Sequence, residues 1–260
     1  MNQTDKAKRF ADLHVKGVPL LLFNAWDAGS AKSVLAAGAQ AIATSSWSVA
    51  EAQGYRDGEA IPIALAEQIV ARIAATIDAP VTVDFEGGYS DDDGELAGNV
   101  SRLLDLGVIG INFEDRVVKG SGLYDIDRLA RRIATIRKAA EKKGIDLFIN
   151  ARTDVFFEYG EHAAQAVSEA LDRVKAYAAV GASGFFAPGL VDDALIGRIC
   201  EGVSLPVNVM VMEGVPSNAR LAALGVARIS YGPIPYIRAT KALEQEARTA
   251  LNEAATHSVG

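Results

Sequence analysis

The sequence predicts a (β/α)8 barrel of the TIM type, formed by residues 1–260 as a single domain. Short apolar runs alternate with amphipathic stretches eight times, as expected when each strand is followed by a helix. Several amphipathic stretches end in a glycine that leads into the next apolar run, as in Ala37-Gly38-Ala39 and Leu106-Gly107-Val108. A glycine at this position is typical of helix ends. The apolar run Leu20-Leu21-Leu22-Phe23 is continuous, which indicates a parallel strand buried on both faces.

The expected elements follow one another in strict alternation. The strands cover residues 20–24, 41–45, 81–84, 110–114, 147–152, 184–187, 207–210 and 228–230. The helices cover residues 28–38, 62–77, 92–106, 126–143, 161–179, 191–202, 216–224 and 235–255. The region 235–260 is thus a long C-terminal helix with a short tail. An open, doubly wound sheet is the alternative architecture, but the chain has no glycine-rich dinucleotide fingerprint to support it.

Composition narrows the class of protein. The formal net charge of -7 argues against a nucleic-acid partner. No apolar run approaches the roughly 20 residues that span a bilayer, and the polar start of the chain has no signal-peptide core. The single cysteine, Cys200, excludes internal disulfides and cysteine-rich zinc sites, and its helical setting indicates plain packing. We therefore expect a cytoplasmic protein with no membrane partner.

The third predicted strand ends in two carboxylates. Residues i and i+2 of a strand point to the same face, so Thr82, Asp84 and Glu86 are expected on one side. The glycine pair Gly87-Gly88 then lets the chain turn away. In a barrel, the chemistry lies at the carboxyl ends of the strands.

The other predicted strand ends carry further polar groups. They are Asn24 to Asp27, Thr44 to Trp47, Glu114 to Arg116, Asn150 to Asp154, Asn208 and Ser230. Any one of these could be a helix cap or a solvated loop charge. Together, acids on two adjacent strands with an arginine on the next predict a pocket for a divalent cation and an anion.

The residue types select among possible chemistries. Oxygen ligands without histidine or cysteine favour Mg²⁺, with Mn²⁺ as the alternative, over zinc. His14, His162 and His257 lie away from the strand ends and are not expected to be ligands. No lysine lies in a strand; only Lys119 is near the mouth of the barrel, which argues against a Schiff-base mechanism.

The remaining chemistry is metal-assisted cleavage next to a 2-oxo acid. The cation would polarise a carbonyl and stabilise the enolate. Arg152 would pair with a substrate carboxylate. Backbone N–H groups of the turn at Ser45, Ser46 and Trp47 would bind the developing oxyanion.

The strand ends also resemble those of the isocitrate lyase / phosphoenolpyruvate mutase superfamily along nearly the whole chain. The matching pieces are Asn24-Ala25-Trp26-Asp27, Ala43-Thr44-Ser45-Ser46, Gly54-Tyr55-Arg56-Asp57-Gly58-Glu59, Val83-Asp84-Phe85-Glu86-Gly87-Gly88-Tyr89, Asn112-Phe113-Glu114-Asp115-Arg116, Asn150-Ala151-Arg152-Thr153-Asp154 and Leu205-Pro206-Val207-Asn208-Val209. The resemblance implies a (β/α)8 barrel whose last helix is exchanged with a neighbouring subunit, usually in a tetramer. It therefore implies a homo-oligomer, a dimer of swapped dimers.

The resemblance also implies roles for individual residues. Asp84 is expected to bind Mg²⁺ directly, and Glu86, Glu114 and Asp57 through water. Asp57, Arg152 and Glu114 are the expected catalytic residues. The substrate-binding residues are expected to be Ser45, Ser46, Trp47, Arg152 and Asn208. The substrate is then a small anionic 2-oxo acid.

Two departures from the superfamily pattern limit the expected reaction. The lyase branch carries a catalytic cysteine in the loop after the fourth strand, but residues 117–124 contain no cysteine or histidine. Tyr124 and Lys119 are the local candidates for a replacement acid or base. Phosphoenolpyruvate mutase has a histidine near the end of the sixth strand, where this chain has Ala187-Pro188-Gly189.

The preferred hypothesis is a Mg²⁺-dependent lyase-type enzyme that cleaves a C–C bond next to a small 2-oxo acid or its enolate, for example a 2-oxo acid decarboxylase or acyl lyase. Cleavage of a P–C bond is the less favoured variant of the same reaction. The first alternative is a catalytically weakened protein of the same fold that binds 2-oxo acids. The second is a structural oligomer in which the acids serve only as caps.

Overall fold

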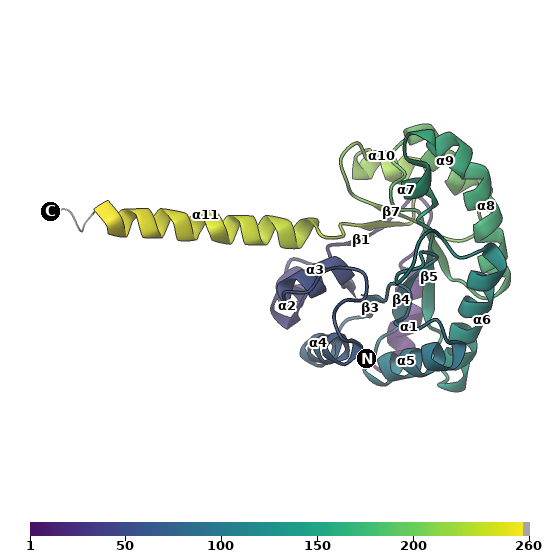
Figure 1. Ribbon diagram of the computed structural model, residues 1–260, viewed down its shortest axis with the longest axis horizontal. Coiled ribbons are helices and arrows are strands. Elements are labelled where there is room, and N and C mark those ends of the chain that lie inside the picture. Colours follow the sequence, from purple (N-terminus) through teal and green to yellow (C-terminus); the bar gives the residue numbers. More distant parts are fainter. Residues whose placement is uncertain (257–260) are drawn as a thin grey trace.

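The computed structural model describes residues 1–256 and contains an eight-stranded parallel sheet in the order β1-β8-β7-β6-β5-β4-β3-β2. A bridge between Ala25 and Thr44 brings the two ends of this sheet together, so that it forms a barrel (Figure 1). The strands are β1 Leu20–Leu22, β2 Ile42–Ala43, β3 Val81–Asp84, β4 Gly110–Glu114, β5 Phe148–Arg152, β6 Gly184–Phe186, β7 Val207–Met210 and β8 Arg228–Ser230. The predicted (β/α)8 barrel is confirmed.

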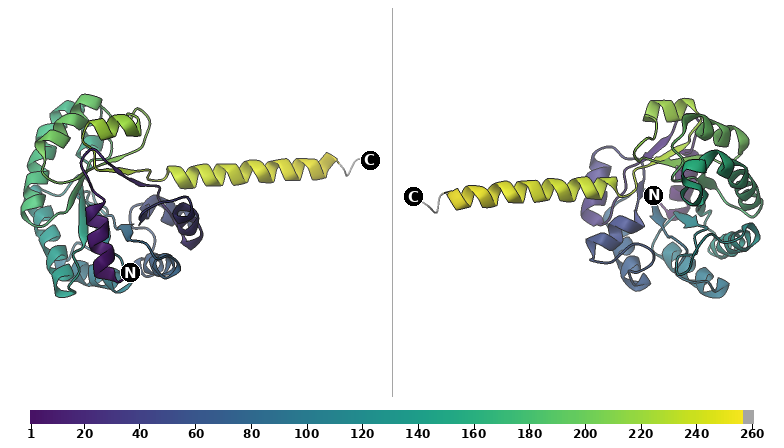
Figure 2. Two further views of the ribbon diagram at one scale, coloured as in Figure 1. Left: turned by 180° about the vertical axis from the view of Figure 1, so that it is seen from behind. Right: turned by 45° about the horizontal axis from the view of Figure 1, so that its top comes forward.

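Helices alternate with these strands and surround the barrel (Figure 2). The eight that were expected are α2 Ala28–Ala36, α4 Ile63–Thr76, α5 Asp93–Asp105, α6 Ile126–Lys142, α8 Ala163–Ala179, α9 Asp193–Gly202, α10 Asn218–Ala223 and α11 Ile234–Thr256. Aspartate side chains begin several of them: Asp92, Asp125 and Asp192 each accept hydrogen bonds from backbone N–H groups of the first turn. The predicted strands and helices therefore exist, with ends that differ by a few residues.

Three further α-helices were not predicted. They are α1 Gln3–Asp12, α3 Ser46–Ala52 and α7 Val155–Tyr159, the last followed by a short 3-10 turn, η1 Gly160–His162. The segment at Ser45, Ser46 and Trp47 was expected to be a turn, but Ser45 is the N-cap of α3 and accepts a hydrogen bond from the Ser48 N–H. Helices α3 and α7 have seven and five residues and carry little periodic pattern, whereas α1 has ten residues, as many as the predicted α9, and was missed despite its length.

Apolar side chains fill the space between the strands and the surrounding helices, whereas the barrel interior is unusually polar. The amide of Asn150 and the guanidinium of Arg228 both donate to Asn112 Oδ1, at 2.9 and 3.0 Å. Arg228 is 1% exposed, and its Nε and Nη1 have no hydrogen-bond partner among the described residues. Burial lowers the pKa of Arg228 to about 9, and the negative charge of Asp84 opposes this shift.

Helix α1 covers the end of the barrel where the strands begin. The Gln3 amide donates to the carbonyl groups of Leu104 and Val108 just before β4. Phe10 packs edge-on against Phe148, and the His14 ring stacks on Phe148 at 4.1 Å between centroids. His14 thus has a structural position at the base of the barrel, far along the strands from the predicted site. His257, which was not expected to be a metal ligand, lies outside the described residues.

Cys200 matches its expected setting. Cys200 is buried in an apolar cluster, as its helical pattern indicated. No helix in residues 1–256 is both long and apolar enough to cross a membrane.

Helix α11 leaves the barrel instead of packing on it (Figures 1 and 2). Ile237, Leu243 and Leu251 on this helix are exposed. On the barrel, a groove of about 560 Å³ lies between β1 and α2. Its walls include Leu21, Phe23 and Val34. The barrel therefore lacks a helix over β1, and α11 lacks an apolar surface to cover.

The buried histidine generates a prediction about pH. His14 Nδ1 lies 2.7 Å from the Phe10 carbonyl oxygen, and burial together with Arg228 lowers the pKa of His14 from 6.5 to about 3. The unfolded chain therefore binds a proton at a higher pH than the folded chain does. The stability that depends on neutral His14 is present above pH 6.5 and is lost as the pH falls toward 3.

We expect His14→Phe to remove this part of the pH dependence. Between pH 7 and 4.5 the parent should lose about 2–3 kcal/mol more unfolding free energy than the variant. Urea denaturation at several pH values measures the difference. If the unfolding free energies of the parent and the variant change equally with pH, the lowered pKa of His14 is contradicted.

Candidate active site

The carboxylate at the end of β3 is held in place by the start of α3. The Ser46 backbone N–H and hydroxyl donate to Asp84 Oδ2 at 3.1 and 2.9 Å. The other carboxylate oxygen, Asp84 Oδ1, is buried and has no hydrogen-bond partner in the described chain. A buried oxygen without a donor is costly unless something outside the protein binds it. Asp84 is therefore oriented by the fold, with one oxygen available to a ligand.

Glu86 lies in a tight turn just beyond β3. Its backbone is in the left-handed region, with φ 50°, and the following Gly88 also has a positive φ. A Cβ on Gly88 would lie 2.4 Å from Leu96, so the turn requires glycine there. The Glu59 backbone N–H donates to Glu86 Oε2, and the Glu86 side chain is buried. The glycine pair thus turns Glu86 back beside Asp84.

Arg152 joins the ends of β4 and β5. Glu114 and Arg152 are neighbours in the register of these strands, and Arg152 Nη1 lies 3.1 Å from Glu114 Oε2. Asp154 holds the other edge of the guanidinium through two hydrogen bonds, at 2.6 and 3.0 Å. The Arg152 guanidinium also lies over the Phe186 ring, 5.8 Å from its centroid. Such a bidentate pair fixes the plane of the guanidinium.

Four carboxyl groups gather around this arginine. Burial, followed by the charges of neighbouring acids, raises the pKa of Glu86 to about 9. Burial raises the pKa of Glu114 to about 8, although Arg152 acts in the opposite direction. The pKa of Asp57 is raised by burial and by Asp84. These shifts have one cause, which is that the site holds more buried negative charge than its positive charge can balance.

Two adjoining cavities open on this cluster. The larger, of about 330 Å³, is lined by Ser46, Asp57, Gly58, Glu86, Glu114, Arg116, Val118 and Arg152. The second, of about 160 Å³, is lined by Asn24, Ser45, Ser46, Trp47, Asp57, Asp84, Asn112, Arg152, Phe157, Phe186, Met210, Ser230, Gly232 and Pro233. Both cavities include Ser46, Asp57 and Arg152, so these three residues form the boundary between them.

The structure brings together most of the residues predicted from the sequence. Asp57, Asp84, Glu86, Glu114, Ser45, Ser46, Trp47 and Arg152 all line one or both cavities. Asn208 lies lower in the barrel, where its Oδ1 accepts a hydrogen bond from Ser230, and it does not line either cavity. The Ser46 N–H points at Asp84 and not into free space.

A buried ion pair supports the site from behind and was not recognised in the sequence. Asp115 is fully buried, accepts a hydrogen bond from the Asp154 N–H at 2.9 Å and pairs with Arg173 of α8 at 3.1 Å. Tyr177 contacts the same carboxylate. This arrangement fixes Asp154, which in turn holds Arg152. The Glu-Asp dipeptide at 114–115 could have suggested a paired acid at Asp115. The partner of Asp115, Arg173 on α8, could not be identified from the spacing of residues in the sequence.

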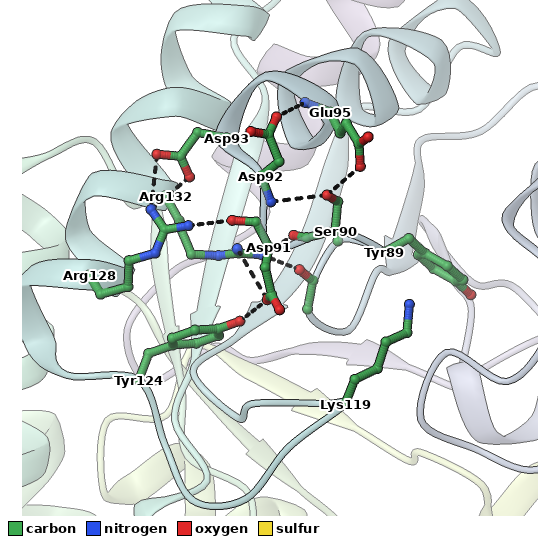
Figure 3. Close-up of polar contacts among 12 residues, drawn as sticks. Tyr89, Ser90, Asp91, Asp92, Asp93, Glu95, Lys119, Tyr124, Arg128 and Arg132 are labelled. Atoms are coloured by element: carbon green, nitrogen blue, oxygen red, sulfur yellow. Dashed lines mark hydrogen bonds and ion pairs between the residues drawn. The ribbon is translucent and has the colours of Figure 1, made fainter.

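In the loop at 117–124, Lys119 and Tyr124 lie beside the turn that carries Tyr89, Ser90 and Asp91 (Figure 3). Tyr124 donates to Asp91, and its pKa is raised to about 12 by burial and by that hydrogen bond. Lys119 lies 3.5 Å from Glu59. Both residues line a small cavity that adjoins the larger site cavity at Arg116 and Val118, and neither lines the two larger cavities themselves. The two replacement acid or base candidates are therefore committed to other partners.

In the part of the chain that the structure describes, no three acid, histidine or cysteine side chains converge closely enough to form a direct metal site by themselves. The cluster instead presents one open oxygen, on Asp84, beside carboxyl groups with raised pKa. This donor set suits a hard cation that keeps part of its water shell.

Fold and site together define a barrel enzyme with a carboxylate cluster at the carboxyl ends of its strands. The family model described as phosphoenolpyruvate phosphomutase matches residues 10–251. The chain therefore belongs to this family.

Individual relatives agree with this membership. A solved structure of a protein from Burkholderia cenocepacia J2315, named as a candidate phosphonomutase, is 48% identical with a TM-score of 0.91, over 94% of this chain and 99% of that one. An uncharacterized protein of Mycobacterium tuberculosis (strain ATCC 25618 / H37Rv) is 34% identical over 92% of this chain and 87% of its own length. An oxaloacetate decarboxylase of Pseudomonas savastanoi pv. phaseolicola is 32% identical, over 66% of this chain and 58% of its own length. The predicted superfamily and the predicted class, a lyase-type enzyme, are confirmed.

Proposed function

We propose that this protein is a Mg²⁺-dependent lyase that cleaves a C–C bond next to a small 2-oxo acid or its enolate. The observation that carries the proposal is the excess of buried carboxylate at the ends of β3 and β4, with Asp84 Oδ1 left without a donor. A divalent cation would offset much of this negative charge, and its remaining coordination positions could hold an anionic substrate. The named decarboxylase among the relatives supports the same reaction class.

The residues present fit such a cation. Asp84 would bind it directly, and Glu86 and Glu114 would bind it through water. Mn²⁺ has the same ligand preference and could substitute. When bound, the cation supplies a Lewis acid beside the 2-oxo carbonyl.

The remaining roles fall to side chains whose positions are fixed by the fold. Arg152 binds the substrate carboxylate, because Asp154 holds the plane of its guanidinium and Arg152 lines both cavities. Asp57 lies on the boundary of the two cavities, next to the reacting end of the substrate. Ser45, Ser46 and Trp47 line the side of the pocket at the start of α3, and Asn208 supports its floor through Ser230.

A second candidate is a protein that binds 2-oxo acids without efficient turnover. The observation that favours it is the absence of cysteine and histidine from the linings of both cavities within residues 1–256. The usual lyase acid is therefore missing, and Tyr124 and Lys119 lie outside these linings. The same absence disfavours P–C bond chemistry.

A substrate panel separates these candidates. We expect Mg²⁺-dependent turnover, abolished by EDTA, of at least one of oxaloacetate, dimethylmalate, methylisocitrate, phosphonopyruvate and 4-hydroxy-4-methyl-2-oxopentanoate. The panel covers charged and uncharged leaving halves. Calorimetry with oxalate and Mg²⁺ should accompany it. Oxalate binding without any turnover would favour the second candidate. The absence of both oxalate binding and turnover would contradict both candidates.

Metal titration tests the proposed ligands. Asp84→Asn should weaken Mg²⁺ affinity by about tenfold or more, because it removes the charge of the direct ligand. Glu86→Asp should change it by no more than about threefold, because a water-mediated contact tolerates a shorter side chain. Isothermal calorimetry of the two variants measures which one loses more Mg²⁺ affinity. An equal loss of affinity in both, or a larger loss in Glu86→Asp, would contradict Asp84 as the direct ligand.

The exposed C-terminal helix supports an oligomer. We propose that α11 of one subunit covers the groove between β1 and α2 of another, giving a dimer of swapped dimers. The groove and the exposed leucines of α11 are complementary apolar surfaces. We also place the protein in the cytoplasm without nucleic-acid or membrane partners, on the basis of its net charge of -7.

Charge substitutions on α11 test this assembly. Leu243→Glu with Leu251→Glu should reduce the mass measured by light scattering after gel filtration, because two carboxylates would enter an apolar groove. Gln245→Glu with Thr249→Glu is the matched control, since it adds the same two charges at exposed positions on the opposite side of the helix. A parent protein that is monomeric, or a double variant of unchanged mass, would contradict the exchange of α11.

A further inference from the structure

The segment that leads from β8 into α11 forms part of the wall of the site. Gly232 and Pro233 line the second cavity together with Trp47 and Arg152. Tyr236, three residues after Pro233, lies in the first turn of α11. The helix that leaves the barrel therefore begins at the edge of the pocket.

Asn24 fixes the position of this segment. Its side-chain oxygen accepts hydrogen bonds from the backbone N–H groups of Tyr231 and Gly232, at 3.0 and 2.9 Å. Its amide donates to the Thr44 carbonyl oxygen at 2.7 Å, and the side chain is buried. One side chain thus ties together the chain segments that follow β1, β2 and β8, just before α11 starts.

Tyr236 joins two tryptophan rings, which come from the segments that follow β1 and β2. The Tyr236 ring packs edge-on against Trp26, with 5.2 Å between centroids and an interplanar angle of 89°. It also packs edge-on against Trp47, at 5.9 Å and 75°. Aromatic pairs in this geometry are favourable beyond the area that they bury. Trp26 and Trp47 are the two tryptophans of the chain, so both contact the same tyrosine.

The side chain of Trp47 has few other constraints. Trp47 is half-buried in the first turn of α3, whereas the next three residues of this helix are buried. Among the described residues, its indole N–H has no hydrogen-bond acceptor and its ring pairs with no aromatic side chain besides Tyr236. The direction in which the indole faces the second cavity therefore depends on Tyr236.

We infer that Tyr236 positions Trp47 for binding of the 2-oxo acid, so that the base of α11 is a functional part of the pocket. Tyr236 lines neither cavity and acts only through the indole. Without the Tyr236 ring, the indole samples further rotamers, and a ligand must then restrict it again at a cost in entropy. This assignment rests on the proposed function and adds to it a residue outside the acid cluster.

Calorimetry with oxalate and Mg²⁺ tests the role of Tyr236. Tyr236→Ala removes both ring pairs and should weaken oxalate binding about fivefold or more, because the ligand must then order the indole. Tyr236→Phe keeps the ring and should bind oxalate within about twofold of the parent. Tyr236→Leu fills much of the same space without an aromatic edge. It should show a loss in the same direction, and it replaces Tyr236→Ala if that variant does not fold.

Two further readouts separate positioning from a general loss of structure. Mg²⁺ affinity without oxalate should change by less than about twofold in these variants, because Ser46 and not Tyr236 holds Asp84. The tryptophan emission of free Tyr236→Ala should lie at longer wavelength than that of the parent, because its indoles are more exposed. Oxalate with Mg²⁺ should move this emission back toward the parent.

Two control variants accompany these measurements. Arg238→Ala changes an exposed residue on the opposite side of α11 and should keep the parent affinity and emission. Leu243→Glu with Leu251→Glu retains Tyr236 and should keep the oxalate affinity of the parent, whatever its mass. An equal loss of oxalate affinity in this double variant would assign the effect to assembly and overturn the role of Tyr236.

The outcomes distinguish this assignment from the proposed function. If the parent binds oxalate with Mg²⁺ and a folded Tyr236→Ala or Tyr236→Leu binds it equally well, the assignment is wrong and the proposed function stands. A loss in Tyr236→Phe as large as in Tyr236→Ala would also contradict it, because the ring is retained. If the parent binds no oxalate, both are wrong.

Discussion

Uncompensated negative charge at the carboxyl ends of β3 and β4 is the constraint on which the rest of the site depends. Asp57, Asp84, Glu86 and Glu114 are held close together around the half-buried Arg152, with Glu86 and Glu114 buried, Asp84 half-buried and Asp57 at the exposed edge. Like charges in such a place raise one another's pKa. The fold maintains this arrangement at a cost to stability, which is the usual character of a binding site for a cation and an anion.

The structure around the cluster serves to hold these charges in fixed positions. The left-handed turn at Glu86 and the glycine at 88 direct one carboxylate, and the start of α3 directs Asp84. Arg152 is held by Asp154, whose backbone is held by Asp115, and Asp115 is paired with Arg173 on an outer helix. Orientation is thus transmitted from the helical layer to the pocket through three consecutive polar contacts. Rigid support of this kind keeps reacting groups in place.

The barrel interior adds a second charge below the first. Arg228 lies deep in the barrel with a lowered pKa, and Asp84 is the acid whose charge favours its ionised form. Asn112 links it to Asn150 by hydrogen bonds. This polar interior is only partly hydrogen-bonded, since Arg228 Nε and Nη1, Asn150 Oδ1 and Asn208 Nδ2 have no partner among the described residues.

The sequence by itself determined the barrel and the strand ends that meet at its mouth. It also determined the acids and the arginine at those ends. The reason is that the alternation of apolar runs and the two-residue spacing along a strand are local properties. Asp84 at the end of β3 and Arg152 at the end of β5 could be predicted for this reason, whereas Glu86 lies beyond β3 in a left-handed turn that the spacing along a strand does not describe. Only the tertiary structure decided which partners these groups have: Arg173 comes from α8, Glu59 from a loop, and Phe157 from a helix of five residues. It also decided that α11 leaves the barrel and that Phe157, Phe186 and Met210 line the pocket beside the acids. Contacts between distant segments depend on how the helices pack around the barrel, which no local pattern encodes.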